Sequence, residues 1–147
     1  MLVSVPYKAT PQIGRDFGHL LAGKVVLDTG NPFPGRDGEM AHAARAKGAG
    51  LASKAFLPGV RLVRAFNSIG HYSLRSEAHR AGEKIGVPLA SDDKGALEVA
   101  SQLVRDAGFE PVIVGGLARA KTFDVGTSVF GQALPAKVLR WRLGLKK

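Results

Sequence analysis

Short apolar runs alternate with helix-like segments along the chain, and this alternation restricts its fold more than any other feature of the sequence. The strand-like runs cover residues 2–5, 24–28, 60–66, 84–90 and 111–114. Helix-like segments cover residues 10–21, 39–56, 72–81, 94–107 and 135–145, and Gly48 and Gly50 interrupt the second of them. Strands that alternate with helices are typical of βαβ units. We therefore expect an α/β fold with a mostly parallel sheet and helices packed on its faces.

Two of the predicted helices have clear end signals. Thr10 is placed to cap the first, with Pro11 at its first helical position. Residues 91–93 supply a cap and negative charge at the start of a later helix, and Gly108 ends it. The expected apolar faces comprise Ile13, Phe17, Leu20 and Leu21 in the first helix, Leu97, Ala100, Val104 and Ala107 in the later one, and Val138, Leu139, Trp141 and Leu145 in the C-terminal one.

The length and composition are those of one ordinary globular domain. The chain has 147 residues, of which 45% are hydrophobic and 22% are charged. It has no apolar run near 18 residues and no secretory leader pattern, which argues against a membrane span and against export. It has no cysteine, which excludes disulfides and thiolate zinc sites and fits a reducing compartment. We expect a single domain over residues 1–147, located in the cytoplasm.

The chain is strongly basic, with a formal net charge of +9. A basic surface favours anionic partners such as nucleotides, nucleic acid, acidic lipid or phosphorylated cofactors. Most basic residues are scattered, and they cluster only at the end, at Lys137, Arg140, Arg142, Lys146 and Lys147. No known nucleic-acid-binding motif accompanies the charge. Nucleic-acid binding is therefore the weakest of the hypotheses that we consider.

The segment Leu2–Val5 is strand-like almost from the first residue. A parallel strand that is buried on both faces normally has neighbours on both sides. As the first strand of the chain, this one would leave an apolar edge on the sheet, which natural proteins usually cover. We expect a missing N-terminal half, or a partner that supplies one, and we expect the chain to form a homo-oligomer.

Five motifs occur in order along the chain. They are SVPY at residues 4–7, GKVVLDTGNPFPGRDG at 23–38, LPGVRLVRAFNSI at 57–69, ASDDKGALEVASQLVRDAGFEPV at 90–112 and VGGLARAKTFD at 114–124. In this order and spacing they resemble the dinucleotide-binding domain of the NADP oxidoreductases that depend on the deazaflavin coenzyme. The series is similar also to the cytoplasmic domain of the six-transmembrane ferric reductases. The resemblance covers nearly the whole chain.

The resemblance implies a Rossmann-like domain and hydride transfer between a nicotinamide, from NADP or NAD, and a deazaflavin coenzyme or flavin-like acceptor. The cofactors supply that chemistry, so no catalytic acid or base is required. The family carries a glycine fingerprint in the first half of its domain, whereas this sequence has no G-x-G-x-x-G. The chain therefore looks like the second half of a dinucleotide-binding domain, N-terminally truncated relative to the family.

Eight residues match positions that bind cofactors in the family. Val5, Pro6 and Tyr7 look like the loop beside the nicotinamide and its ribose, and an ordinary strand-ending turn is the alternative. Tyr7 either stacks on a ring or covers the core. The other five residues are Asn31, Pro32, Asn67, Ser68 and Ile69. We expect no metal site, because the histidines lack the spacing of metal ligands.

The two asparagines are the most informative of these eight residues. Asn31 follows the second strand, where it would hydrogen-bond an amide or a ribose, and a local turn is its alternative. The resemblance places Asn67 in the hydride-transfer cleft, and capping of the helix that starts near His71 is its alternative. Nearby, Arg36 and Asp37 match the family's loop pattern, but a surface ion pair is the simpler interpretation.

Three hypotheses for the function follow. The chain is a nicotinamide-dependent oxidoreductase or the substrate-side half of one, a degenerate binding or scaffold module that keeps the fold without nucleotide affinity, or a basic nucleic-acid-binding protein. The absence of phosphate-binding glycines favours the second hypothesis over the first for this chain alone. The reason is that backbone donors at a helix N-terminus supply much of the affinity for a pyrophosphate.

Overall fold

A computed structural model describes residues 1–145, so Lys146 and Lys147 of the basic cluster lie outside the described residues. The chain forms a five-stranded sheet in which neighbouring strands follow one another in sequence order. The strands are β1 (Leu2–Val3), β2 (Val25–Asp28), β3 (Arg61–Arg64), β4 (Gly86–Ala90) and β5 (Glu110–Gly115). The strand β1 therefore lies at one edge of the sheet and β5 at the other.

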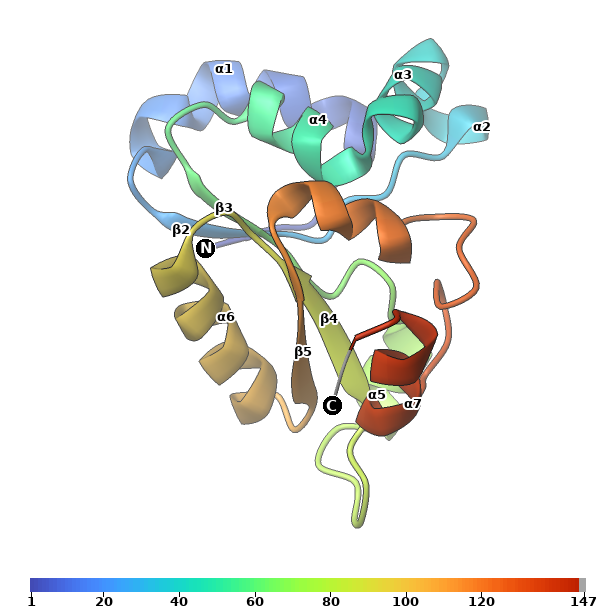
Figure 1. Cartoon of the computed structure of the whole chain (residues 1–147). Coiled ribbons are helices and arrows are strands. Elements are labelled where there is room, and N and C mark those ends of the chain that lie inside the picture. The colour runs from blue at the N-terminus through green and yellow to red at the C-terminus, as the bar shows by residue number, and fades with distance from the viewer. Residues whose placement is uncertain (146–147) are drawn as a thin grey trace.

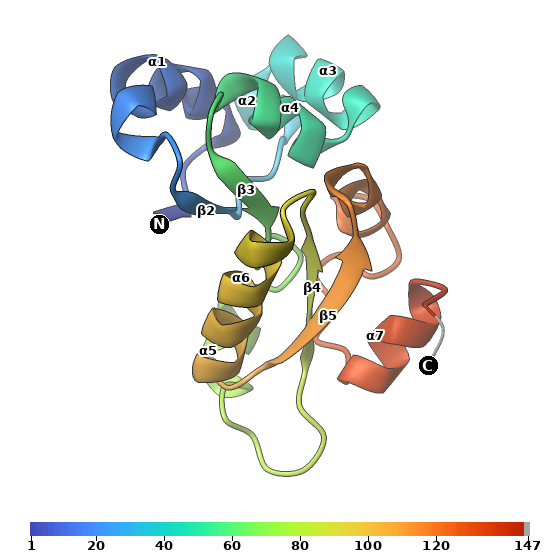
Figure 2. The ribbon, with the colours of Figure 1, turned by 60° about the vertical axis from the view of Figure 1, so that its left-hand side comes forward.

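Three of the four strand pairings are parallel. The strands β1, β2 and β3 form one parallel group, and β4 and β5 form another. The two groups meet in an antiparallel contact between Arg64 and Ala90, the last residues of β3 and β4. Figure 2 shows the two groups extending in different directions from this junction. The prediction of a mostly parallel α/β sheet is confirmed, and the antiparallel step is an addition that the sequence did not indicate.

Helices cover both faces of the sheet, as Figure 1 shows. They are α1 (Thr10–Leu21), α2 (Pro34–Asp37), α3 (Glu39–Lys47), α4 (Ala49–Phe56), α5 (His71–Ser76), α6 (Lys94–Asp106) and α7 (Ala136–Arg142), with 3-10 segments η1 (Tyr7–Ala9) and η2 (Leu117–Phe123). On one face α1 and α4 pack around Val26 and Leu62. On the other face α6 packs around Leu27 and Val63. Adjacent residues of β2 and β3 thus pack into cores on opposite faces of the sheet, because successive side chains of a strand point to opposite faces.

The two helices with the clearest end signals form as predicted. The helix α1 has the predicted bounds, although its N-cap is Ala9 and not Thr10. Asp93 caps α6, because its carboxylate accepts a hydrogen bond from the amide of Ala96 at 2.8 Å. Gly108 follows α6 with a φ of 88°, a conformation that glycine adopts at low cost.

Other elements are shorter than predicted. The mostly helical segment expected over residues 39–56 is divided into α3 and α4 at Gly48, which has a φ of 97°, as predicted, whereas Gly50 lies within α4 and does not interrupt it. The helix expected over residues 72–81 is reduced to the six residues of α5. The first strand has two residues because Pro6, which has no backbone donor, leads directly into η1.

Two of the predicted apolar faces are only partly buried. Phe17 and Leu20 of α1 are 51% and 53% exposed, and Trp141 of α7 is 76% exposed. An amphipathic pattern identifies an apolar face, but it does not show whether the chain itself covers that face. No helix within residues 1–145 is long and apolar enough to cross a membrane.

Candidate functional site

The loops that follow β1, β2 and β3 converge at the carboxyl edge of this parallel group. After β2, the Thr29 hydroxyl donates to the carbonyl of Val3, at the end of β1, at 3.3 Å. The Nδ2 of Asn31 donates to the carbonyl oxygen of Asn67, after β3, at 2.7 Å. Ligands of open α/β sheets bind outside the carboxyl ends of the strands. This edge is therefore the candidate functional site.

Asn67 connects the edge to a third segment of the chain. Its Nδ2 donates to the carbonyl of Phe123, at the end of η2, at 3.3 Å. Asn67 is only 4% exposed. It does not cap α5, whose N-cap is Gly70, so the capping alternative is wrong. Asn67 instead holds loops from three parts of the chain together.

Two buried oxygens at this edge have no hydrogen-bond partner among the described residues. They are Oδ1 of Asn31 and Oδ1 of Asn67. A buried polar atom without a partner costs about 1–3 kcal/mol, and native structures usually supply one. A donor group of a ligand, or an ordered water, would satisfy these two acceptors. The edge therefore has an unmet capacity to accept hydrogen bonds.

Phe66, the residue before Asn67, has left-handed backbone geometry with a φ of 59°. A positive φ is uncommon outside glycine, and a bulky aromatic residue there is strained. Such strain is concentrated at ligand-binding and active sites in proteins. Phe66 lies two residues after the end of β3, and its backbone bend leads directly into the turn that contains Asn67.

A buried ion cluster lies at the same carboxyl edge. Arg64, the last residue of β3, is completely buried. Its Nη1 donates to Asp28 Oδ2 at 3.0 Å and to the carbonyl of Gly30 at 2.6 Å, and its Nη2 donates to Asp124 Oδ1 at 2.9 Å. Burial alone would lower the pKa of Arg64, but the two carboxylates outweigh burial and raise it. The cluster fixes the ends of β2 and β3 and the segment after η2 in one arrangement.

Tyr7 is fully buried and therefore has the second of its two predicted roles, in the core. Its hydroxyl donates to the carbonyl of Ala49 at 2.9 Å and lies 3.0 Å from the hydroxyl of Ser53. Burial raises the pKa of Tyr7 to about 12. Tyr7 thus attaches the loop after β1 to α4. Of its predicted neighbours, Val5 is half-buried and Pro6 is exposed.

Three more of the predicted residues are packed into the protein. Ser68 is buried, and its carbonyl accepts a hydrogen bond from the amide of Gly131 at 2.7 Å. Ile69 belongs to the core that includes α6, and Pro32 is also buried. The predicted cofactor contacts of these three residues remain a prediction, and in the structure their side chains pack against the chain itself. Of the eight predicted residues, only Pro6 is exposed.

The predicted surface ion pair of Arg36 and Asp37 forms at 2.8 Å, but its carboxylate is buried. Asp37 also accepts hydrogen bonds from the amides of Phe33 at 2.9 Å and Lys8 at 3.3 Å. The hydrogen bond from Arg36 is the largest cause that lowers the pKa of Asp37 to about 2. Arg36 also donates to the carbonyl of Asn31 at 2.8 Å. The pair therefore stabilises the loop that carries Asn31.

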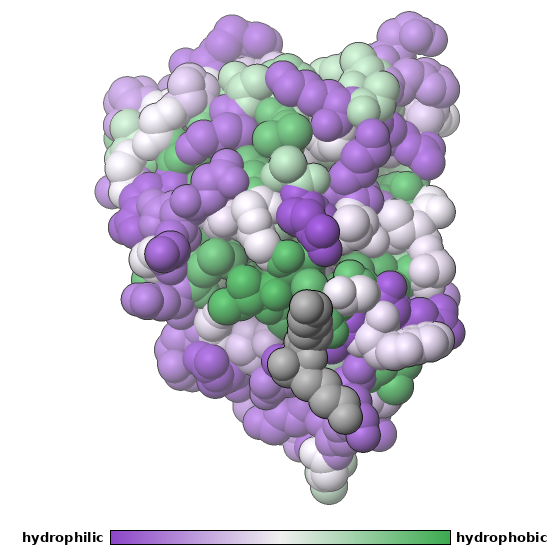
Figure 3. Space-filling view, viewed as in Figure 1, coloured by the Kyte–Doolittle hydropathy of each residue, from purple (hydrophilic) through white to green (hydrophobic). Residues whose placement is uncertain are grey.

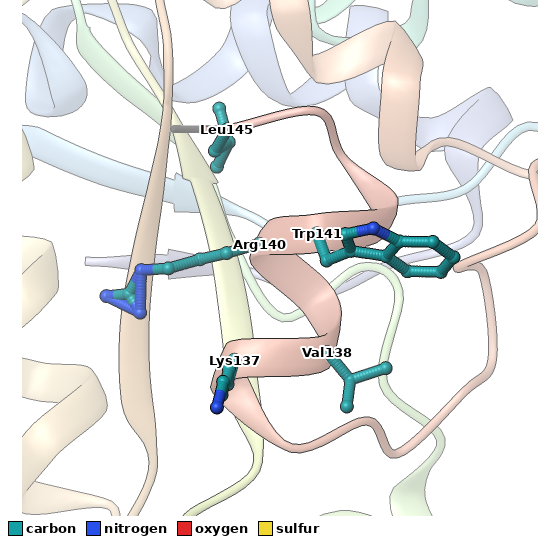
Figure 4. Close-up of a pocket in the computed structure, with 5 residues that line it drawn as sticks. All are labelled: Lys137, Val138, Arg140, Trp141 and Leu145. Carbon is teal, nitrogen blue, oxygen red and sulfur yellow. The ribbon is translucent and has the colours of Figure 1, made fainter. Parts of the chain in front are cut away.

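Several surface cavities lie away from the two asparagines. One, of about 480 Å³, is lined by Lys137, Val138, Arg140, Trp141 and Leu145. Figure 4 shows that Trp141 and Arg140 extend in opposite directions from α7. Figure 3 shows apolar surface gathered near the middle of the view. On β5, Ile113 is 53% exposed. A second cavity, of about 380 Å³, lies along β1 and α1 and includes Val5.

Within the described chain, no group of histidine, aspartate and glutamate residues could hold a metal ion.

The ion cluster is the part of this edge that sequence reasoning missed. The sequence does contain a sign of this cluster, because two charged residues stand in strand-like apolar runs. Arg64 interrupts the run at residues 60–66, and Asp28 ends the run at 24–28. A charged residue at a buried strand position needs a partner of opposite charge. The second partner, Asp124, lies 60 residues further along the chain, and no local pattern identifies it.

Comparison with solved structures shows the fold. The chain superimposes on the hypothetical protein SMa0349 from Sinorhizobium meliloti with a TM-score of 0.72 and 20% identity, covering 91% of this chain and 65% of that one. It also superimposes on a protein proposed to be an F420-dependent NADP reductase, from Arthrobacter sp. FB24, with a TM-score of 0.73 and 16% identity, covering 90% of this chain and 68% of that one. No family model and no curated protein matches the sequence. This chain spans about two thirds of the length of these two structures and shares with them a Rossmann-like α/β fold.

Proposed function

We propose that this chain binds the nicotinamide end of NADP, or of NAD, at the carboxyl edge of β1–β3. There it takes part in hydride transfer with a deazaflavin coenzyme or a flavin-like acceptor. The Rossmann-like fold and the similarity to the Arthrobacter protein support a nicotinamide dinucleotide as the ligand. The five sequence motifs support the deazaflavin coenzyme as the second cofactor.

The two oxygens without partners, Oδ1 of Asn31 and Oδ1 of Asn67, carry this proposal. The carboxamide of a nicotinamide offers two N–H donors, and its ribose offers hydroxyl donors, so both match acceptors of this kind. The two oxygens are buried, so binding opens the 2.7 Å hydrogen bond between the loops of Asn31 and Asn67. The strained turn at Phe66 is the place at which the second loop can move.

The residues at this edge fit the nicotinamide better than the phosphates of the dinucleotide. The sequence has no G-x-G-x-x-G, and the guanidinium of Arg36 is already paired with the buried Asp37. The bound nicotinamide supplies the hydride chemistry. The chain orients the ring through Asn31 and Asn67 and excludes water through the packed side chains of Phe66 and Ile69.

Calorimetric titration with NADPH, reduced nicotinamide mononucleotide and ADP-ribose tests the proposal. We expect the first two to bind and Asn31→Ala to weaken both at least tenfold. Gln102→Ala, which removes an exposed carboxamide from α6, is the matched control and should bind like the unmodified chain. No heat of binding with NADPH, together with an unchanged melting temperature at high NADPH, would refute the proposal.

A degenerate binding or scaffold module is the second candidate, and one observation favours it. Five of the eight predicted cofactor-binding residues are buried against the protein's own chain: Tyr7, Pro32, Asn67, Ser68 and Ile69. A module of this kind keeps the packed edge and has no affinity for nucleotides. The same titration separates the two candidates, because a module binds none of the three ligands.

A further inference from the structure

A short stretch of the chain between η2 and α7 contacts both loops of the candidate site. Figure 1 shows the connection between η2 and α7 as a long loop. In this loop the ring of Phe130 packs edge-to-face against Phe33, which lies in the loop that carries Asn31, with ring centroids 6.5 Å apart. The next amide, that of Gly131, donates to the carbonyl of Ser68 in the loop after β3 at 2.7 Å. The stretch therefore bridges the two loops close to the two asparagines.

This stretch, residues 130–133, lies between two residues that are firmly held. On one side Val129 is 3% exposed and belongs to the core formed with β5 and α7. On the other side the carbonyl of Leu134 accepts from the amide of Gly86, on β4, at 2.9 Å. The four residues between them belong to no helix or strand, and none is buried, although Ala133 packs partly on the core of α6. Segments with few buried contacts open locally at low cost.

Gly131 gives the stretch a point at which its backbone can change conformation. Its φ is 73°, and glycine adopts positive and negative φ about equally readily. Gly131 is exposed, and a Cβ at this position would meet no described atom within 4 Å. Packing at Gly131 therefore does not prevent a change of conformation that would break the hydrogen bond to Ser68 and separate the ring of Phe130 from Phe33.

The oxygens that the proposed nicotinamide site uses are enclosed in the present arrangement. Oδ1 of Asn31 and Oδ1 of Asn67 are buried, and the two loops that carry them are joined by a hydrogen bond of 2.7 Å. Donors of a ligand reach these oxygens once the loops separate. The contacts of Phe130 and Gly131 hold the same two loops, so these contacts oppose the separation.

We propose that residues 130–133 form a lid that is closed in the free chain and opens to admit the nicotinamide, an inference that rests on the function proposed above. The ring pair of Phe33 and Phe130 and the hydrogen bond from Gly131 to Ser68 form its latch. A lid that must open first limits the rate at which a ligand enters. It also lowers the apparent affinity in proportion to the open fraction, so a weaker latch should both speed and strengthen binding.

Hydrogen exchange of the Gly131 amide tests the lid without any ligand. We expect this amide to be protected, because it is hydrogen-bonded to Ser68, and to exchange faster than the amides of β4 and β5 through local opening. Phe130→Ala should speed its exchange by about tenfold, since that substitution removes the ring pair. An amide that exchanges only together with β4 and β5, or one as fast as in an unfolded chain, would overturn the proposal.

Stopped-flow fluorescence of reduced nicotinamide mononucleotide tests the gating role. Phe130→Ala should raise the association rate by about three- to tenfold and lower the dissociation constant, while the melting temperature shows that the variant is folded. Phe17→Ala, which removes a ring that is 51% exposed on α1, is the matched control and should bind like the unmodified chain. Equal association rates for Phe130→Ala and the unmodified chain would overturn the proposal.

A double-mutant cycle tests whether the two rings act as one latch. Phe33→Ala should speed association as Phe130→Ala does, and the double variant should bind no faster than either single variant. Fully additive effects would contradict a shared latch. Failure of the lid and failure of the proposed function are distinguishable, because the exchange of Gly131 involves no ligand. Absence of binding by every variant refutes the proposed function and the gating role with it, whereas binding at equal rates refutes the lid alone.

Discussion

The guanidinium of Arg64 on β3 lies 2.9 Å from the carboxylate of Asp124, 60 residues later in the chain. The same guanidinium lies 3.0 Å from Asp28 at the end of β2. One buried cation therefore holds together the carboxyl ends of β2 and β3 and the segment after η2. The loops that carry Asn31 and Asn67 begin directly after these strands, so the cluster determines where the two asparagines meet.

Removal of the buried cation should destabilise the protein strongly. Arg64→Leu leaves the carboxylate of Asp28 buried without its partner, and the expected loss is about 3–5 kcal/mol in the free energy of unfolding. Arg61→Leu is the matched control on the same strand, because Arg61 pairs with Asp93 near the surface. That substitution should cost much less, because solvent screens an ion pair at the surface. Urea denaturation measures both losses, and equal losses would contradict the structural role of Arg64.

The ion pair of Asp37 should make stability depend on acid pH. The pKa of Asp37 is lowered to about 2 in the folded protein, so its contribution is present above the unfolded pKa near 4. The contribution is lost as the pH falls from about 4 to about 2. Asp37→Asn should therefore lower stability by about 1 kcal/mol at pH 7 and by much less at pH 2. Urea unfolding at several pH values measures this difference, and a difference that does not vary with pH would show that the pair contributes nothing.

The buried hydroxyl of Tyr7 should affect stability at alkaline pH. Its pKa is raised to about 12, so the folded state favours the protonated phenol. The resulting stabilisation is present below the unfolded pKa near 10 and is lost as the pH rises through 12. Tyr7→Phe removes the hydrogen bonds to Ala49 and Ser53 and should cost about 1 kcal/mol at neutral pH. Ultraviolet titration should show one tyrosine that ionises near pH 12, and its persistence in Tyr7→Phe would assign it to another residue.

Two helical glycines should respond in opposite directions to the addition of a methyl group. A Cβ at Gly50 of α4 would lie 2.9 Å from Cγ of Arg64 and 3.1 Å from a methyl of Leu117, closer than packing allows. Gly50→Ala should therefore destabilise the protein by about 1–3 kcal/mol. A Cβ at Gly18 of α1 would meet no described atom within 4 Å, so Gly18→Ala should stabilise it by about 0.5–1 kcal/mol. Thermal unfolding measures both, and a stabilising Gly50→Ala would contradict the packing around Arg64.

Local signals in the sequence predicted the regular elements well. The bounds of α1 and the Asp93 cap of α6 follow from capping residues and apolar periodicity, which act within a few residues. The same signals overestimated α5 and the first strand, since weak periodicity does not locate where tertiary contacts end an element. They also placed Phe17 in a buried face, whereas burial depends on what the rest of the chain supplies.

The candidate site was predictable only in part. Strand ends indicated that Asn31 and Asn67 would lie at one edge, and the structure brings them to 2.7 Å. The hydrogen bond from Asn31 to the carbonyl of Asn67, and the two side-chain oxygens without partners, depend on three-dimensional packing, which no sequence pattern predicts. The Arg64–Asp124 pair was missed for the same reason, since it joins segments that are 60 residues apart.

The most direct test of the proposed nicotinamide site uses the side-chain amide signals of the chain in ¹⁵N nuclear magnetic resonance. Asn31 and Asn67 are the only two asparagines, so their carboxamide groups report on this edge alone. We expect titration with reduced nicotinamide mononucleotide to shift both signals in a saturable manner. The carboxamide signals of Gln12 and Gln102, which lie on the exposed surfaces of α1 and α6, should stay in place. Unchanged Asn31 and Asn67 signals at millimolar ligand would contradict the account.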